Sequence, residues 1–212
     1  MIERWTDPRG GLPGLVNVER GGAYGWAVFT NAGRHRVKLG RVWDLRRPVL
    51  VVVMLNPSRA DHEKDDPTVR RVVAFAKHHG YGGILILNLY TLIATDPQTL
   101  RAWPCPPDLH DPEAQHVDPE SGSGDYRQIQ GADEVFEWAT DNLAFEHAAG
   151  APRDVLVAWG AAKGIQKRVD EVVAILRGKG RPARLVCLGK NADGSPRHPL
   201  YLAKDTPLEP WP

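Results

Sequence analysis

Cysteine is nearly absent from this chain, whose 212 residues include only Cys105 and Cys187. The two stand far apart in the sequence, which supports neither a disulfide framework nor a four-cysteine zinc or iron–sulfur site. Long apolar runs are also absent: no segment approaches the roughly 20 apolar residues of a membrane-spanning helix. The first residues, MIERWTDPRGG, carry charges, proline and glycine where a secretion signal has an apolar stretch. We therefore expect reduced thiols and a cytoplasmic protein without a membrane partner.

An excess of charge of either sign is missing as well. The formal net charge is +1 and the isoelectric point is near 7.9. No chain-wide field therefore attracts nucleic acid, and contact with DNA would need a local basic groove. The length and an apolar content of 42% predict one domain, residues 1–212, with one sizeable core.

What the chain does have is a set of apolar segments rich in β-branched residues. Continuous runs of this kind are typical of strands that are covered on both faces, as in a parallel sheet. We predict such strands within residues 48–55, 82–90, 153–160 and 183–189.

Two amphipathic helices are predicted between these strands. Asp66 is suited to cap the first, Pro67 to begin it and Gly80 to stop it. The second carries an apolar stripe from Ile165 to Leu176 and ends at Gly178. Alternating strands and helices predict an α/β fold, a three-layer sandwich around a four-stranded parallel sheet.

The remaining segments extend this core, which we place at residues 48–203. Residues 23–44 alternate in polarity around an Asn-Ala-Gly turn, so residues 1–47 are predicted to form an N-terminal antiparallel β-hairpin extension. A long loop rich in proline, glycine and aspartate is expected at about 104–132, followed by a helix to about 148. Residues 204–212 form a tail.

Polar residues collect where the predicted strands end. Asn56, Pro57 and Ser58 follow the first strand, Asn88 closes the second, and His198 lies in the loop after the fourth. Each has a structural explanation when taken alone, because Asn-Pro opens turns and asparagine caps strand ends. Ligands of open parallel sheets bind outside the carboxyl ends of the strands. Their shared position therefore predicts a ligand site.

An acidic segment, RADHEKDD, follows Ser58 directly, and three interpretations of it stay open. Asp66 can cap the helix while the other carboxylates are solvated and balanced by neighbouring lysine and arginine. Alternatively, Asp65 or Asp66 enters the pocket as an acceptor or general base. Two carboxylates could also share a divalent metal, but no histidine–carboxylate spacing supports this. We expect neither a metal nor a cofactor.

Several motifs resemble known families. The segments MLNPSRAD, DDPTVRR, GYGG and HPLYL are similar to those of a bacterial family, DUF1643, a domain of unknown function. Four segments, VVVMLNPS, GGILILNLYTL, VLVAWG and HPLYL, also resemble in order and separation the signature segments of the uracil-DNA glycosylase superfamily.

The glycosylase resemblance implies roles for individual residues. Asn56 matches the residue that orients the water attacking the sugar, and an amide would position that water rather than deprotonate it. His198 matches the donor that stabilises the departing base, and Asn88 matches the reader of the extruded base. Leu200 or Tyr201 could wedge into the base stack.

The implied activity is hydrolysis of an N-glycosidic bond, releasing a modified or unmodified nucleobase from DNA. Where uracil-preferring enzymes have an aromatic after the motif's proline, Pro57, this chain has Ser58, so the identity of the base stays open. Two alternatives remain: a non-catalytic module that binds a nucleobase, nucleotide or modified nucleic acid, and a glycosidase of free nucleotides. The expected partner is a nucleobase-containing substrate, with DNA as one candidate, and the sequence does not identify protein partners.

Overall fold

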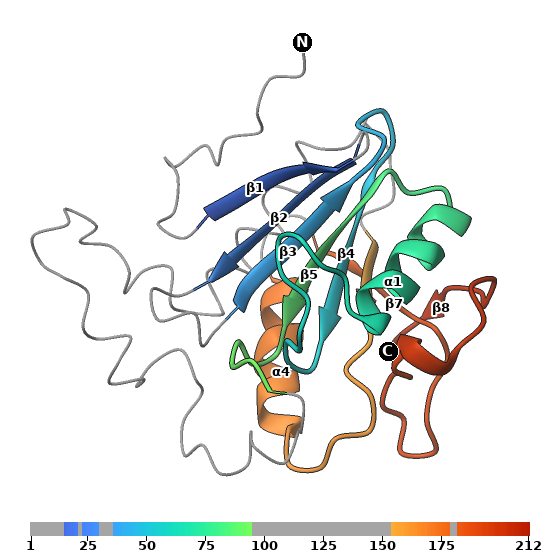
Figure 1. The fold of residues 1–212 in the computed structure, drawn as a ribbon. Coiled ribbons are helices and arrows are strands. Elements are labelled where there is room, and N and C mark those ends of the chain that lie inside the picture. The colour runs from blue at the N-terminus through green and yellow to red at the C-terminus, as the bar shows by residue number, and fades with distance from the viewer. Residues whose placement is uncertain (1–14, 21–22, 30–35, 95–153, 179–181) are drawn as a thin grey trace, which may run out of the picture.

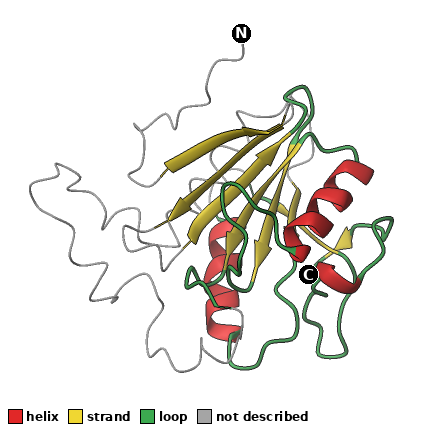
Figure 2. Cartoon of the chain, in the orientation of Figure 1, coloured by secondary structure: helices red, strands yellow, loops and turns green. Residues whose placement is uncertain are grey.

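The computed structural model describes residues 15–20, 23–29, 36–94, 154–178 and 182–212, and shows a mixed α/β fold (Figure 1). In this part of the chain one sheet of eight strands lies between helices (Figure 2). The strands are β1 (Leu15–Arg20), β2 (Ala23–Phe29), β3 (Arg36–Val42), β4 (Val49–Met54), β5 (Gly83–Asn88), β6 (Asp154–Val157), β7 (Arg184–Cys187) and β8 (Glu209–Pro210). The helices of the described residues are α1 (Pro67–His78), α4 (Gln166–Leu176) and the short 3-10 helix η3 (Pro199–Tyr201).

The four predicted apolar strands form the middle of this sheet. Its order is β1-β2-β3-β5-β4-β6-β7-β8, and β5, β4, β6 and β7 are parallel to one another. The chain first winds from β4 to β5 on one side and then crosses to β6 on the other side of β4. The direction of winding therefore reverses between β4 and β6, whose carboxyl ends lie side by side.

The parallel strands are continued by antiparallel strands at both edges. The predicted hairpin is present as β2 and β3, and β3 pairs with β5, so the hairpin belongs to the central sheet. The sequence did not indicate β1, nor β8, which pairs with β7 from within the expected tail. The turn of the hairpin, the expected loop at 104–132 and the helix after it lie outside the described residues.

Helix α1 forms where its sequence signals place it. The Asp66 side chain accepts a hydrogen bond from the backbone N–H of Val69 at 2.8 Å, and Pro67 opens the first turn. Its stripe of Val69, Val72, Phe75 and Ala76 is buried, and Gly80 follows the last turn with φ 83°. Helix α4 likewise buries Val169, Val172 and Leu176, as predicted.

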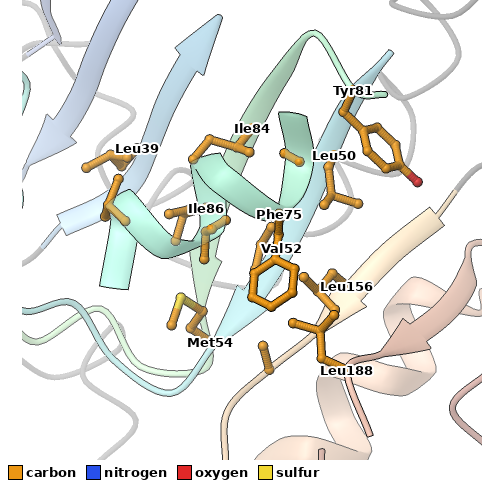
Figure 3. Close-up of a cluster of buried hydrophobic side chains, with 14 of the residues drawn as sticks. Leu39, Leu50, Val52, Met54, Phe75, Tyr81, Ile84, Ile86, Leu156 and Leu188 are labelled. Atoms are coloured by element: carbon orange, nitrogen blue, oxygen red, sulfur yellow. The ribbon is translucent and has the colours of Figure 1, made fainter. Parts of the chain in front are cut away.

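The two helices cover opposite faces of the sheet. Alternate residues of each central strand point to opposite faces, so one strand supplies two separate cores. On one face α1 packs on Leu50, Val52, Ile84, Ile86 and their neighbours (Figure 3). On the other face α4 packs on the intervening residues, among them Val51, Val53, Leu85 and Leu87. The described residues therefore form three layers, with helix, sheet and helix in turn.

Candidate functional site

The loop after β7 returns to the reversal point between β4 and β6. The N–H of Gly160, just past β6, donates to the carbonyl of Pro196 at 3.1 Å. A Cβ built on Gly160 would lie 3.5 Å from the Cβ of His198. Gly160 has φ 76°, a conformation that glycine adopts most easily. This close passage brings His198 to the same rim as the end of β4.

Asn56 lies at that rim, half-buried, directly after β4. Its Nδ2 donates to the carbonyl of Ala94 at 2.7 Å and to that of Pro57 at 3.0 Å. Two carbonyl acceptors require the NH₂ group on that side, so the orientation of the amide is fixed. Among the described residues, none donates to Oδ1. Asn56 therefore presents an oriented acceptor that could hold a water molecule or a ligand N–H.

His198 is a neutral donor in this arrangement. Burial lowers its pKa from the usual 6.5, while the charge of Asp66 acts in the opposite direction. Its Nδ1 faces the backbone N–H of Leu200, at 3.4 Å, where it caps η3. A neutral imidazole that accepts at Nδ1 carries its proton on Nε2. His198 can therefore donate an N–H without carrying a positive charge.

Asn88 is buried at the end of β5, where it is 3% exposed. Its Oδ1 faces the Nη2 of Arg36, the first residue of β3, at 3.5 Å. The same guanidinium donates through Nη1 to the carbonyl of Ala60 at 2.7 Å. Sequence reasoning missed Arg36. The available signal was the run RHRVKLGR, which puts cations in a predicted strand of a sheet.

The acidic segment is held in place by a second arginine of β3. Arg41 pairs with the Asp65 carboxylate at 2.8 Å and donates to the backbone carbonyl of Asp61 at 2.5 Å. The Asp61 carboxylate accepts from the backbone N–H groups of Glu63 and Lys64. Asp66 caps α1, as the first of the three interpretations had it, but the partner of Asp65 comes from β3 rather than from the neighbouring basic residues.

The remaining predicted site residues surround this rim. Pro57 is buried and accepts through its carbonyl from the N–H of Ala94 at 3.0 Å. Ser58 and Leu200 are half-buried, whereas the Tyr201 side chain is 89% exposed on η3. Helix η3 packs against α1. Within the described ranges, no group of three or more histidine, cysteine, aspartate or glutamate residues is arranged to hold a metal ion.

The capping role of Asp66 can be measured directly. Asp66→Ala leaves the N–H of Val69 without its side-chain acceptor, and we expect a loss of about 1 kcal/mol in the free energy of unfolding. Asp66→Asn should retain most of the stability, because its amide oxygen can still accept. Urea denaturation of both variants checks this, and equal losses in the two would contradict a capping role.

The family described as a protein of unknown function (DUF1643) matches residues 36–200, more than half of the chain, and the chain therefore belongs to it. The matched region begins at Arg36 in β3 and ends at Leu200 in η3, so it contains Asn56, Asn88 and His198 and stops one residue before Tyr201. Comparisons with curated proteins and with solved structures gave no match. No helix in the described part of the chain is long and apolar enough to span a membrane.

Proposed function

We propose that this protein hydrolyses an N-glycosidic bond and releases a nucleobase, modified or unmodified, from DNA. The observation that carries the proposal is the state of His198: its Nδ1 faces a backbone N–H, so the neutral ring offers Nε2–H at the rim. The four segments that resemble uracil-DNA glycosylases contain the same rim residues, which supports the proposal independently of the side-chain geometry.

The chemistry requires a donor that stabilises the leaving base. Cleavage of the bond between sugar and base passes through an oxocarbenium-like transition state, in which the departing base gains negative charge. A preorganised N–H aimed at that charge stabilises the transition state more than the ground state. His198 supplies this N–H from a half-buried ring, and a base bound over that ring excludes water from the contact.

The attacking water needs positioning more than deprotonation, because the oxocarbenium carbon is strongly electrophilic. The oriented Oδ1 of Asn56 accepts from this water and fixes its direction of attack. Asn88 lies on the neighbouring strand, where its Nδ2 can donate to an acceptor on the base. The exposed ring of Tyr201 is available to fill the gap left in the base stack.

A second candidate is a glycosidase of free nucleotides, and the acidic segment favours it. Asp65 is balanced by Arg41, but Asp61, Glu63 and Asp66 also follow Asn56 closely, and their charges repel the many phosphates of a long nucleic acid. Dependence on salt separates the two candidates. Activity on DNA should fall steeply as salt rises, whereas activity on a nucleotide should change little.

The direct test is base release, measured by mass spectrometry from single- and double-stranded DNA and RNA with damaged and hypermodified bases, and from free nucleotides. We expect release from one substrate, with loss of the activity in Asn56→Ala. His78→Ala, which removes an exposed histidine at the end of α1, is the matched control and should keep full activity. If no base is released from substrates that a known glycosylase processes, the result would favour a binding module that lacks catalysis.

A further inference from the structure

Two buried arginines of β3 differ in how completely their guanidinium groups are bonded. Arg36 is 3% exposed and Arg41 is 5% exposed. Arg41 uses every nitrogen: Nε and Nη2 bind the carboxylate of Asp65, Nη2 also reaches the carbonyl of Asp61, and Nη1 donates to the carbonyls of Trp26 and Gly40. Arg41 is therefore a structural residue whose charge is balanced by Asp65.

Arg36 has no such balance. Within the described residues its guanidinium donates two hydrogen bonds, one to the carbonyl of Ala60 and a long one, 3.5 Å, to Oδ1 of Asn88. Its Nε is buried without a partner, and no carboxylate of the described residues forms an ion pair with it. Burial lowers its pKa to about 10 and the charge of Arg41 adds to this lowering, although the charges of Asp66 and Asp61 act in the opposite direction without forming an ion pair with it.

A buried cation without a counter-charge is costly, and proteins normally pair such groups. Arg36 nevertheless lies at the first position of β3, next to Asn88 at the carboxyl rim of the parallel strands. A guanidinium binds carboxylate and phosphate oxygens more strongly than neutral acceptors, because both partners are charged. We therefore expect a ligand bound at the rim to supply the negative charge that pairs with Arg36.

We propose that Arg36 is the anion-binding residue of this site, and that the ligand carries an oxyanion, a carboxylate or a phosphate, beside the group that Asn88 contacts. The inference rests on the proposed function for the position of the site at the rim, but it does not depend on hydrolysis of an N-glycosidic bond. It identifies the substrate class as an acidic nucleobase or a nucleotide phosphate, because these are the two sources of an oxyanion next to a base.

Calorimetric titration of matched pairs of ligands tests this proposal. Orotate and uracil differ by a carboxylate, and each deoxynucleoside 5′-monophosphate differs from its nucleoside by a phosphate; inorganic phosphate alone completes the set. We expect at least one charged member to bind wild-type protein ten-fold or more tightly than its neutral partner. An advantage for orotate identifies the carboxylate as the source, and one for a monophosphate identifies the phosphate.

Two variants of Arg36 decide whether it is responsible. Arg36→Met should abolish the advantage of the charged ligand, and Arg36→Lys should restore part of it, because an ammonium keeps the charge but not the planar fork. Arg59→Met removes an exposed arginine from the neighbouring loop and should leave the advantage unchanged. Circular dichroism spectra that match wild type show that each variant is folded.

The proposal is overturned if no charged ligand binds more tightly than its neutral partner, or if the advantage survives in Arg36→Met. These outcomes are independent of turnover. Base release that depends on Asn56, without any preference for charged ligands, would overturn the anion site and leave the glycosidase. A preference for charged ligands that depends on Arg36, without base release from any substrate, would overturn the glycosidase and leave the anion site.

Discussion

Replacing His198 with alanine should slow base release about 100- to 1000-fold, the loss typical when one preorganised donor to a developing negative charge is removed. The effect should fall on kcat, because the contact forms only as the base departs, and substrate affinity should change little. Single-turnover kinetics on the substrate found by base release measures both quantities. A large increase in KM with unchanged kcat would show that His198 only binds the substrate.

The pH dependence of the same reaction follows from the pKa of His198. Burial lowers this pKa below the usual 6.5, so the donor is neutral at pH 7. The rate should be constant above pH 6.5 and change only as the pH falls through the lowered pKa, where the ring gains a proton and a positive charge. In His198→Gln, which retains an N–H donor but does not titrate, this acidic limb should disappear.

Phe75→Ala should destabilise the fold by about 3 to 5 kcal/mol, the cost of removing a large aromatic side chain from a packed core. Phe75 is 1% exposed in α1 and packs among side chains of the central strands (Figure 3). The loss should be larger than for the exposed positions of the same helix, because the cavity opens between helix and sheet.

Urea denaturation measures this loss as a lower midpoint with an unchanged slope. Phe75→Leu is the graded control, since it keeps most of the apolar volume and should cost far less. Similar stability in wild type and Phe75→Ala would mean that α1 does not cover this face of the sheet. Asp66 caps the N-terminus of α1, and its charge acts on His198. A shift of the helix would therefore also change the surroundings of His198.

Local signals in the sequence determined the individual elements. Asp66, Pro67 and Gly80 placed the ends of α1 because caps and stops act within one turn of the backbone. The apolar runs located β4 to β7 because strands buried on both faces show no alternation. The same runs located their carboxyl ends, and with them Asn56 and Asn88. The family resemblance likewise rested on short contiguous segments.

Only the tertiary structure decided which elements are neighbours. Arg36 meets Asn88 across 52 residues because β3 pairs with β5, and no local pattern specifies that pairing. The partner of Asp65 is Arg41 for the same reason. The tautomer of His198 depends on the backbone of η3, and its neutrality depends on burial by the surrounding chain. Hydrogen bonds and burial of this kind depend on long-range packing, so the sequence indicated candidate site residues, and the fold determined their charges and partners.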